Sequence, residues 1–105
     1  MIKKYKVVIA DAAKLDVKEI ILNYKLIQKE LAKRFSADLQ IALFSIEKLP
    51  SAYAKRYGDV RFANLDIFPY LVEFFIKDNN EIIVIAVLYN GRDPNFLKSR
   101  SQLKY

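Results

Sequence analysis

The side chains that could do chemistry in this chain are limited by two absences. The 105 residues contain no histidine and no cysteine, so the side chain most often used for acid–base catalysis near neutral pH is missing. Disulfides and thiolate metal sites are excluded as well, and this composition permits a cytoplasmic protein. Any catalysis must therefore use tyrosine, lysine, arginine or carboxylates, and we expect neither a metal nor any other cofactor.

The net charge is positive and offers a second clue. Eighteen Lys and Arg against twelve Asp and Glu give +6, which favours polyanionic partners such as RNA, DNA or an acidic protein segment. Lys55 and Arg56 are adjacent in a predicted loop, and Lys25, Lys29 and Lys33 would form a basic stripe on a helix. The charges are otherwise dispersed, so an ordinary solvated surface explains them equally well.

The first half of the chain predicts a strand followed by two helices. Polar and apolar residues alternate from Lys3 to Ile9, and Asp11 is suited to cap a helix. Helical spacing then recurs from Leu15 to Ile27, with both of these residues on the expected core face, and again from 31 to 49, before Pro50. We place the corner at residues 28–30, with one long bent helix as the alternative.

The second half predicts three antiparallel strands, over 60–67, 70–77 and 81–89. Asp78-Asn79-Asn80 tolerates the backbone of a tight hairpin. The last strand is apolar on both faces, so it should be central and have the N-terminal strand as a neighbour. Residues 50–59 have no period and predict a loop or a short turn of helix.

The expected architecture is therefore a single α+β domain over residues 1–95. It has an N-terminal strand, a helical hairpin and a three-stranded antiparallel meander, which together form a sheet of about four strands. Residues 96–105 form a basic C-terminal tail. The apolar runs are far shorter than the roughly 20 residues of a membrane helix, and no export segment is indicated.

Several short motifs, in this order, resemble the RelE/ParE toxin superfamily of plasmid stabilisation and type II toxin–antitoxin systems. The motifs read Leu31-Ala32-Lys33-Arg34-Phe35, Gly58-Asp59-Val60-Arg61, Phe68-Pro69-Tyr70-Leu71-Val72 and Gly91-Arg92-Asp93-Pro94. The resemblance extends over about residues 4–95. It implies a toxin that inhibits growth in the cytoplasm and is held in check by an antitoxin.

The superfamily divides by target, and the resemblance favours its ParE-like branch. RelE-like members resemble ribosome-dependent ribonucleases, in which cations stabilise the charge that develops on the phosphate. An arginine commonly occupies the place of Tyr70 in those members, and this chain also lacks their late histidine. The Phe-Pro-Tyr variant is similar instead to members that bind DNA gyrase and do no chemistry.

The resemblance and the charge pattern together indicate two sets of candidate residues. If the chain is a nuclease, the catalytic set is Arg61, Tyr89 and Arg92. If it binds a target or nucleic acid, the contact residues are Lys55, Arg56, Arg61, Tyr70 and Arg92. Each has a structural alternative: Arg61 could be a solvated edge charge, Arg92 a turn residue paired with Asp93, and the tyrosines packed sheet aromatics.

The expected partners follow from the same resemblance. Antitoxins of this superfamily resemble extended acidic segments that wrap the toxin and cover charge and apolar surface. Phe74, Phe75 and Ile76 are consecutive, so on a strand they cannot all face one side. Without antitoxin such an apolar surface would favour a homodimer. The expected function is a binding toxin acting on a target such as gyrase; the alternatives are a ribosome-dependent mRNA endoribonuclease and a catalytically inactive interaction module.

Overall fold

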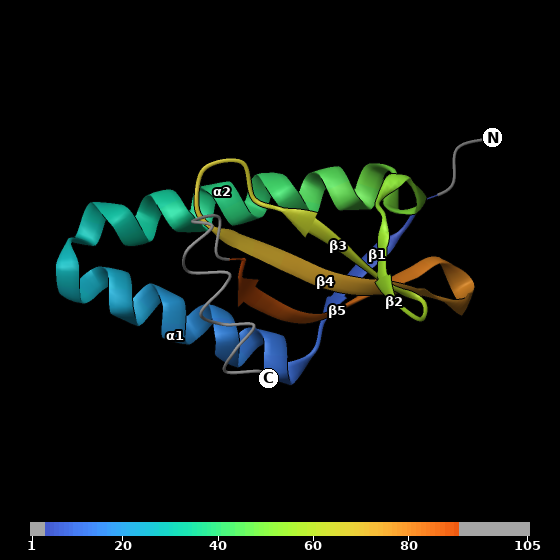
Figure 1. The fold of residues 1–105 in the computed structure, drawn as a ribbon, viewed down its shortest axis with the longest axis horizontal. Helices are drawn as coiled ribbons and strands as arrows, with labels where there is room; N and C mark the ends of the chain where they lie inside the picture. The colour runs from blue at the N-terminus through green and yellow to red at the C-terminus, as the bar shows by residue number, and fades with distance from the viewer. Residues whose placement is uncertain (1–3, 91–105) are drawn as a thin grey trace.

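The computed structural model describes residues 4–90, and Figure 1 shows their arrangement. The elements in chain order are β1 (Lys6–Ile9), α1 (Asp11–Ile27), α2 (Lys29–Lys48), a 3₁₀ turn (Pro50–Ala52), β2 (Lys55–Tyr57), β3 (Val60–Asn64), β4 (Tyr70–Lys77), a second 3₁₀ turn (Asp78–Asn80) and β5 (Glu81–Tyr89). The turn of the helical hairpin lies at one end of the molecule and the β4–β5 turn at the other (Figure 1). The predicted α+β class is confirmed.

The strands form one sheet in the order β1-β5-β4-β3-β2. The pair β1–β5 is parallel and the other pairs are antiparallel. As predicted, β5 is an interior strand and β1 is its neighbour, although the middle strand of the five is β4. Asn80 has a φ of 62° at the end of the β4–β5 turn, which agrees with the predicted Asp-Asn-Asn hairpin.

The sheet has a fifth strand that the sequence did not predict. Strand β2 is three residues long and fully exposed, so it has no buried face and no alternation that could reveal it. It pairs with β3 through a turn in which Gly58 has a φ of +49°. Strand β3 ends at Asn64, earlier than the predicted Ile67.

The helical hairpin breaks where the sequence indicated. Gln28 is extended, with φ −165° and ψ 128°, and its N–H donates to the carbonyl of Tyr24. The expectation that Asp11 caps α1 is wrong, because the N-cap is Ala10 and Asp11 lies in the first turn. There its carboxylate still interacts favourably with the helix dipole.

The core lies between the helices and one face of the sheet. Its buried residues include Ala13 and Ile20 of α1, Phe35, Leu39 and Ile46 of α2, Val72 and Phe74 of β4, and Ile82, Val84 and Val87 of β5. The expectation that Leu15 and Ile27 belong to the core is wrong, because these residues are 56% and 72% exposed. The face of α1 that packs inward is centred on the smaller residue Ala13 and on Ile20, so these two side chains point elsewhere. Within residues 4–90, no helix is long and apolar enough to cross a membrane.

Two carboxylates fasten the helices to the sheet. Asp38 of α2 is buried, and its Oδ2 accepts hydrogen bonds from the amides of Ile67 at 3.0 Å and Phe68 at 2.8 Å. These bonds hold the β3–β4 loop in a shape that a continuing strand could not adopt. They explain why β3 ends before the predicted residue.

The second carboxylate, Asp16 of α1, bonds to β5 at a bulge. Glu73 pairs with Ala86 while Phe74 pairs with Val84, so one residue of β5, Ile85, has no partner on β4. Such a bulge disturbs the ladder of hydrogen bonds. The Oδ2 of Asp16 accepts the amide of Val87 at 3.0 Å, and thereby ties α1 to the irregular part of the strand.

Candidate functional site

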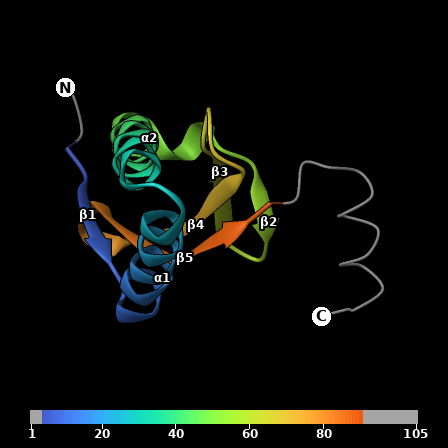
Figure 2. The ribbon, with the colours of Figure 1, turned by 90° about the vertical axis from the view of Figure 1, so that its left-hand side faces the viewer.

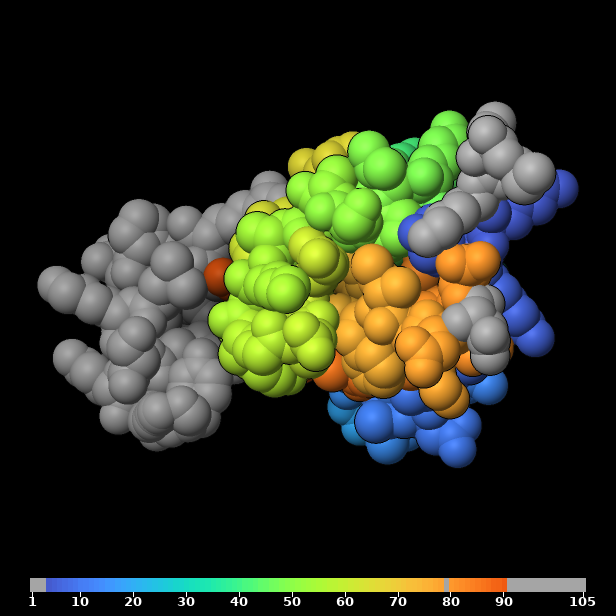
Figure 3. All heavy atoms as spheres, turned by 90° about the vertical axis from the view of Figure 1, so that its right-hand side faces the viewer, coloured from blue at the N-terminus to red at the C-terminus, as the bar shows by residue number. Residues whose placement is uncertain are grey.

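The β2–β3 hairpin holds three of the predicted contact residues. Lys55 and Arg61 are paired across the two strands. The Nζ of Lys55 lies 3.5 Å from a carboxylate oxygen of Asp59, and both side chains are exposed. An exposed pair of this kind is weak, so Lys55 can exchange Asp59 for another anion. Figure 3 shows this part of the chain at the surface, beside the β4–β5 turn.

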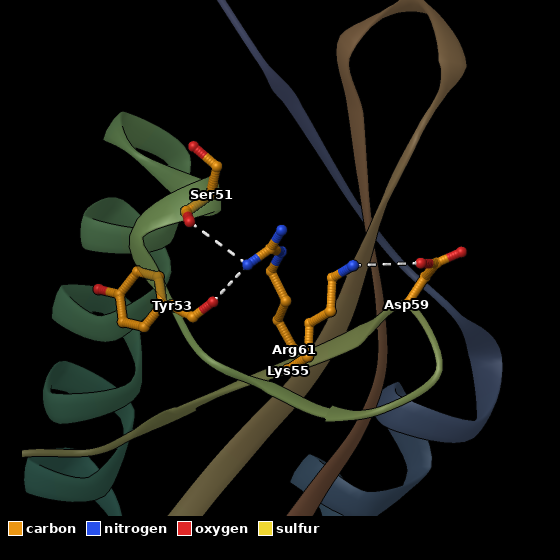
Figure 4. A network of polar contacts seen from close by, with 5 residues as sticks. All are labelled: Ser51, Tyr53, Lys55, Asp59 and Arg61. Carbon is orange, nitrogen blue, oxygen red and sulfur yellow. Dashed lines mark hydrogen bonds and ion pairs between the residues drawn. The ribbon is translucent and has the colours of Figure 1, made fainter.

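Arg61 is engaged within the protein. Its Nη1 donates to the backbone carbonyls of Tyr53 at 2.5 Å and Ser51 at 3.3 Å, as Figure 4 shows. These carbonyls belong to the segment that crosses from α2 to the sheet. The ring of Tyr53 in turn packs edge-on against buried Phe74, with centroids 5.9 Å apart. Arg61 therefore positions the crossing segment over the core.

Arg56 lies on the opposite face of the sheet and meets a carboxylate there. Since Phe74 points to the helices, its neighbour Glu73 points away from them. The Nε of Arg56 lies 3.2 Å from Oε2 of Glu73, whose side chain is 7% exposed, against 43% for Arg56. A carboxylate in such a position requires a cation partner, so Arg56 neutralises a charge of its own protein.

Tyr70 and Tyr89 meet at the end of the sheet nearest the hairpin of helices. They are partners in the β4–β5 ladder, and their rings lie edge-on with centroids 5.6 Å apart. Tyr70 also packs against Tyr24 at 6.4 Å and Phe35 at 5.4 Å. Burial, assisted by a hydrogen bond with Tyr24, raises the pKa of Tyr70 well above its usual range. Its hydroxyl therefore remains protonated at neutral pH and cannot serve as a general base.

Asparagine side chains close the same end of the sheet. The amide nitrogen of Asn90 donates to Oδ1 of Asn64 at 2.9 Å, and its backbone N–H donates to the carbonyl of Pro69 at 3.0 Å. These bonds fix the end of β5 beside the β3–β4 loop.

The candidate residues thus form two groups and not one site. Arg61 is opposite Phe74 on β4, whereas Tyr89 is opposite Tyr70. Arg61 and Tyr89 both lie on the helix side of the sheet, four residues apart along β4, which at about 3.3 Å per residue is roughly 13 Å, whereas Arg56 lies on the other face. Arg92 lies outside the described residues. Within residues 4–90, no group of three or more acidic side chains is arranged to hold a metal ion.

Sequence reasoning missed Glu73. The signal was present, because Glu73 is the one charged residue in the run Leu71 to Ile76. A single carboxylate within an apolar strand has to find a cation, and Arg56 was already a candidate. What the sequence did not provide is strand β2, which brings Arg56 within reach.

Comparison with known proteins places this geometry in context. A family model described as the ParE toxin of the type II toxin-antitoxin system parDE matches residues 7–94. A solved structure described as the chromosomal ParDE TA system from P. aeruginosa is similar, with a TM-score of 0.71 and 20% sequence identity. The alignment covers 82% of this chain and 96% of that chain. At this identity the likeness concerns the fold. No match was found among curated proteins.

Proposed function

Because the chain belongs to the ParE toxin family of type II toxin–antitoxin systems, we propose that it inhibits growth by binding a nucleic-acid-handling target such as DNA gyrase. In this proposal it does no chemistry on that target. The observation that carries it is the Arg56–Glu73 pair on the sheet face away from the helices.

A ribonuclease requires an excess of positive charge where the scissile phosphate binds. On this face Glu73 supplies a negative charge and Arg56 is occupied in neutralising it. On the other face, Arg61 is bonded to two backbone carbonyls. A phosphate would have to displace these contacts before either arginine could stabilise it, and a buried carboxylate would repel it.

Proton transfer is equally poorly supported. The chain has no histidine, and burial with the Tyr24 hydrogen bond raises the pKa of Tyr70 away from neutrality. Cleavage of RNA through its own 2′-hydroxyl needs a base to remove that proton and an acid for the leaving group. Among the described residues, Tyr70 is suited to packing and not to either role.

We assign the target contact to the exposed strand β2, through Lys55 and Tyr57 and through the part of Arg56 that its ion pair with Glu73 leaves exposed. All three side chains are exposed on a short edge strand, and cations beside an aromatic ring suit an interface with an acidic protein surface. Arg61 supports the hairpin from within. Tyr70 packs against Tyr24 and Phe35 in the other group of candidate residues, so it is not assigned to this contact. Arg92 is kept as a proposed contact on the charge pattern of the sequence alone.

The partner that restrains the toxin is proposed to be an acidic antitoxin segment. A net charge of +6 favours such a partner electrostatically. The solved ParDE system shares this fold. Exposed apolar residues at the surface, such as Phe44 and Ile41 on α2, offer anchors for an extended chain that also carries carboxylates.

The test is a direct comparison of two activities. The purified chain is added to gyrase, relaxed plasmid and ATP, and supercoiling is followed on agarose gels. In parallel, transcripts are mapped after induced expression. Inhibited supercoiling with intact messages is the expected result. Cleavage within translated codons would reject the binding toxin, and growth unaffected in several hosts would indicate an inactive interaction module.

A further inference from the structure

The outer face of α2 carries a line of side chains that the fold itself does not bury. Alternate steps of four and three residues separate its members, which are Glu30, Arg34, Ala37, Ile41, Phe44 and Lys48. All six are exposed, and Ile41 and Phe44 are 53% and 56% exposed. The core residues Phe35, Leu39 and Ile46 lie on the opposite side of the helix. Figure 2 shows α2 end-on at the upper edge of the molecule. Such a line of residues suits packing against a second helix.

Polar side chains follow one flank of this line. Lys33, Gln40 and Glu47 are exposed and seven residues apart, so they lie on the same side of α2. The Nζ of Lys33 lies 3.7 Å from Oε1 of Glu30, but these side chains are 70% and 66% exposed, so their attraction is weak. Glu47 makes no ion pair with any residue between 4 and 90. Both charges of this flank can therefore bond to a partner.

We propose that this face of α2 binds α2 of a second copy of the chain, with the helices antiparallel about a two-fold axis level with Leu39. In this register Ala37 of one copy packs beside Ile41 of the other. Arg34 lies beside the ring of Phe44 of the second copy, where a guanidinium is attracted to an aromatic face. The two-fold symmetry makes each of these contacts twice.

The charges are complementary in the same register. The axis is perpendicular to both helices, so it reverses their direction but brings each flank against the same flank of the other copy. Lys33 therefore lies near Glu47 of the second copy. Gln40 lies near Gln40 of the second copy, and two amides can bond to each other. At the ends of the contact Glu30 faces Lys48, so both kinds of ion pair occur twice.

The charge pattern selects this register and a second copy as the occupant. If the axis were moved so that Ile41 packed beside Phe44, Glu30 would lie beyond the end of the contact. Lys33 would also be separated from Glu47. A partner that follows the whole line must carry charges of both signs, and a second copy supplies them at the matching positions.

The β3–β4 loop borders the other flank of the line. Its residue Asp66 lines a small cavity together with Ile41 and Ser45 of α2, which places it beside the contact. In the proposed dimer this is the side towards which Arg34 of the second copy leans, so Asp66 adds an attraction. Asp38 lies on the same flank, but it is buried and bonded to the loop amides.

The size of the contact predicts a weak dimer. The line from Glu30 to Lys48 is about 27 Å long at 1.5 Å per residue. One helix per copy buries less than the roughly 800 Å² per partner of a standard interface, so we expect a dissociation constant of about 10 to 100 µM. Ile41 and Phe44 are also the proposed anchors of the antitoxin, so its binding would exclude the second copy. The dimer is therefore a state of the free toxin.

Sedimentation equilibrium of the full chain across about 1 to 300 µM tests the proposal. Lys33→Glu and Glu47→Lys should each weaken dimerisation by roughly tenfold, because each replaces two attractions by two repulsions. The double variant K33E/E47K restores opposite charges and should return the dissociation constant to about that of the natural chain. An equimolar mixture of the two single variants should do the same, because both flank contacts of the mixed dimer then join opposite charges.

The controls make the same charge changes on α1. Lys18→Glu and Glu19→Lys alter exposed residues outside the contact, so each should change the dissociation constant by less than roughly twofold, and their mixture should gain nothing. Ile41→Asp removes the apolar centre and should leave the chain monomeric, with circular dichroism confirming the fold.

A natural chain that stays monomeric at every concentration would overturn the proposal. So would a dimer that Ile41→Asp leaves intact, or a loss in K18E as large as that in K33E, since net charge would then be the cause. A mixture of K33E and E47K that associates no more tightly than either variant alone would exclude this register. None of these results depends on the target, so the inference can fail while the proposed toxin function stands.

Discussion

Replacing Arg61 by alanine separates a positioning role from direct target contact. The substitution removes the Nη1 bonds to the carbonyls of Ser51 and Tyr53. Hydrogen bonds to a charged group are each worth about 1.5–3 kcal/mol, but the bond to Ser51 is exposed and counts for little. We therefore expect the free energy of unfolding to fall by about 2 kcal/mol.

The loss should be visible as a lower melting temperature. For a domain of this size, 1 kcal/mol corresponds to roughly 4–8 °C, so Arg61→Ala should melt about 8–16 °C below the natural chain. Urea unfolding followed by circular dichroism gives the free energy independently. Lys55→Ala is the matched control, because its partner Asp59 is exposed, and it should change stability by less than about 0.5 kcal/mol.

Growth inhibition is then measured with the amount of folded protein equalised. If Arg61 acts by holding the crossing segment, toxicity per folded molecule should decrease only modestly. A variant with unchanged stability and no toxicity would refute this reasoning, since Arg61 would then have to contact the target itself. Arg61→Lys adds a second check, because a lysine can reach one carbonyl and should recover part of the stability.

Three further substitutions test the buried carboxylates and the partner of one of them. Asp38→Ala leaves the amides of Ile67 and Phe68 without their acceptor, so the free energy of unfolding should fall by about 2–4 kcal/mol in urea titrations. A change below about 0.5 kcal/mol would show that these two hydrogen bonds do not stabilise the β3–β4 loop. Glu73→Gln removes the negative charge beside Arg56, so anisotropy of a labelled single-stranded RNA should show binding about fivefold tighter at low salt. Arg56→Gln should change that affinity in the opposite direction, and equal affinities in all three proteins would show that this face does not contact RNA.

The sequence predicted most of the fold because most elements carry a regular pattern. The limits of β4 and β5 follow from apolar runs bounded by Pro69 and by the Asp-Asn-Asn turn, and they agree with the structure. The break at Gln28 was inferred from polarity alone, without glycine or proline, and it is also confirmed. These features depend on local chemistry, which a single sequence records.

The failures concern features that depend on tertiary contacts. Strand β2 forms because β3 supplies a partner, and nothing in its three exposed residues signals this. Leu15 fits a helical apolar pattern as well as Ala13 does, and only the packing against β5 and α2 decides which one points inward. Likewise the ion pair of Arg56 and Glu73 joins residues seventeen apart through β3.

The acidic and basic side chains of this protein differ in the groups to which they bond. Two acidic side chains, Asp16 and Asp38, bond to backbone amides across element boundaries and are thereby fixed in position. Long basic side chains lose more conformational entropy when they are fixed, and they remain hydrated more readily at the surface. The exposed edge at β2 carries Lys55 and Arg56, so it attracts polyanions in general, and the ion pair with Glu73 takes up part of the charge of Arg56.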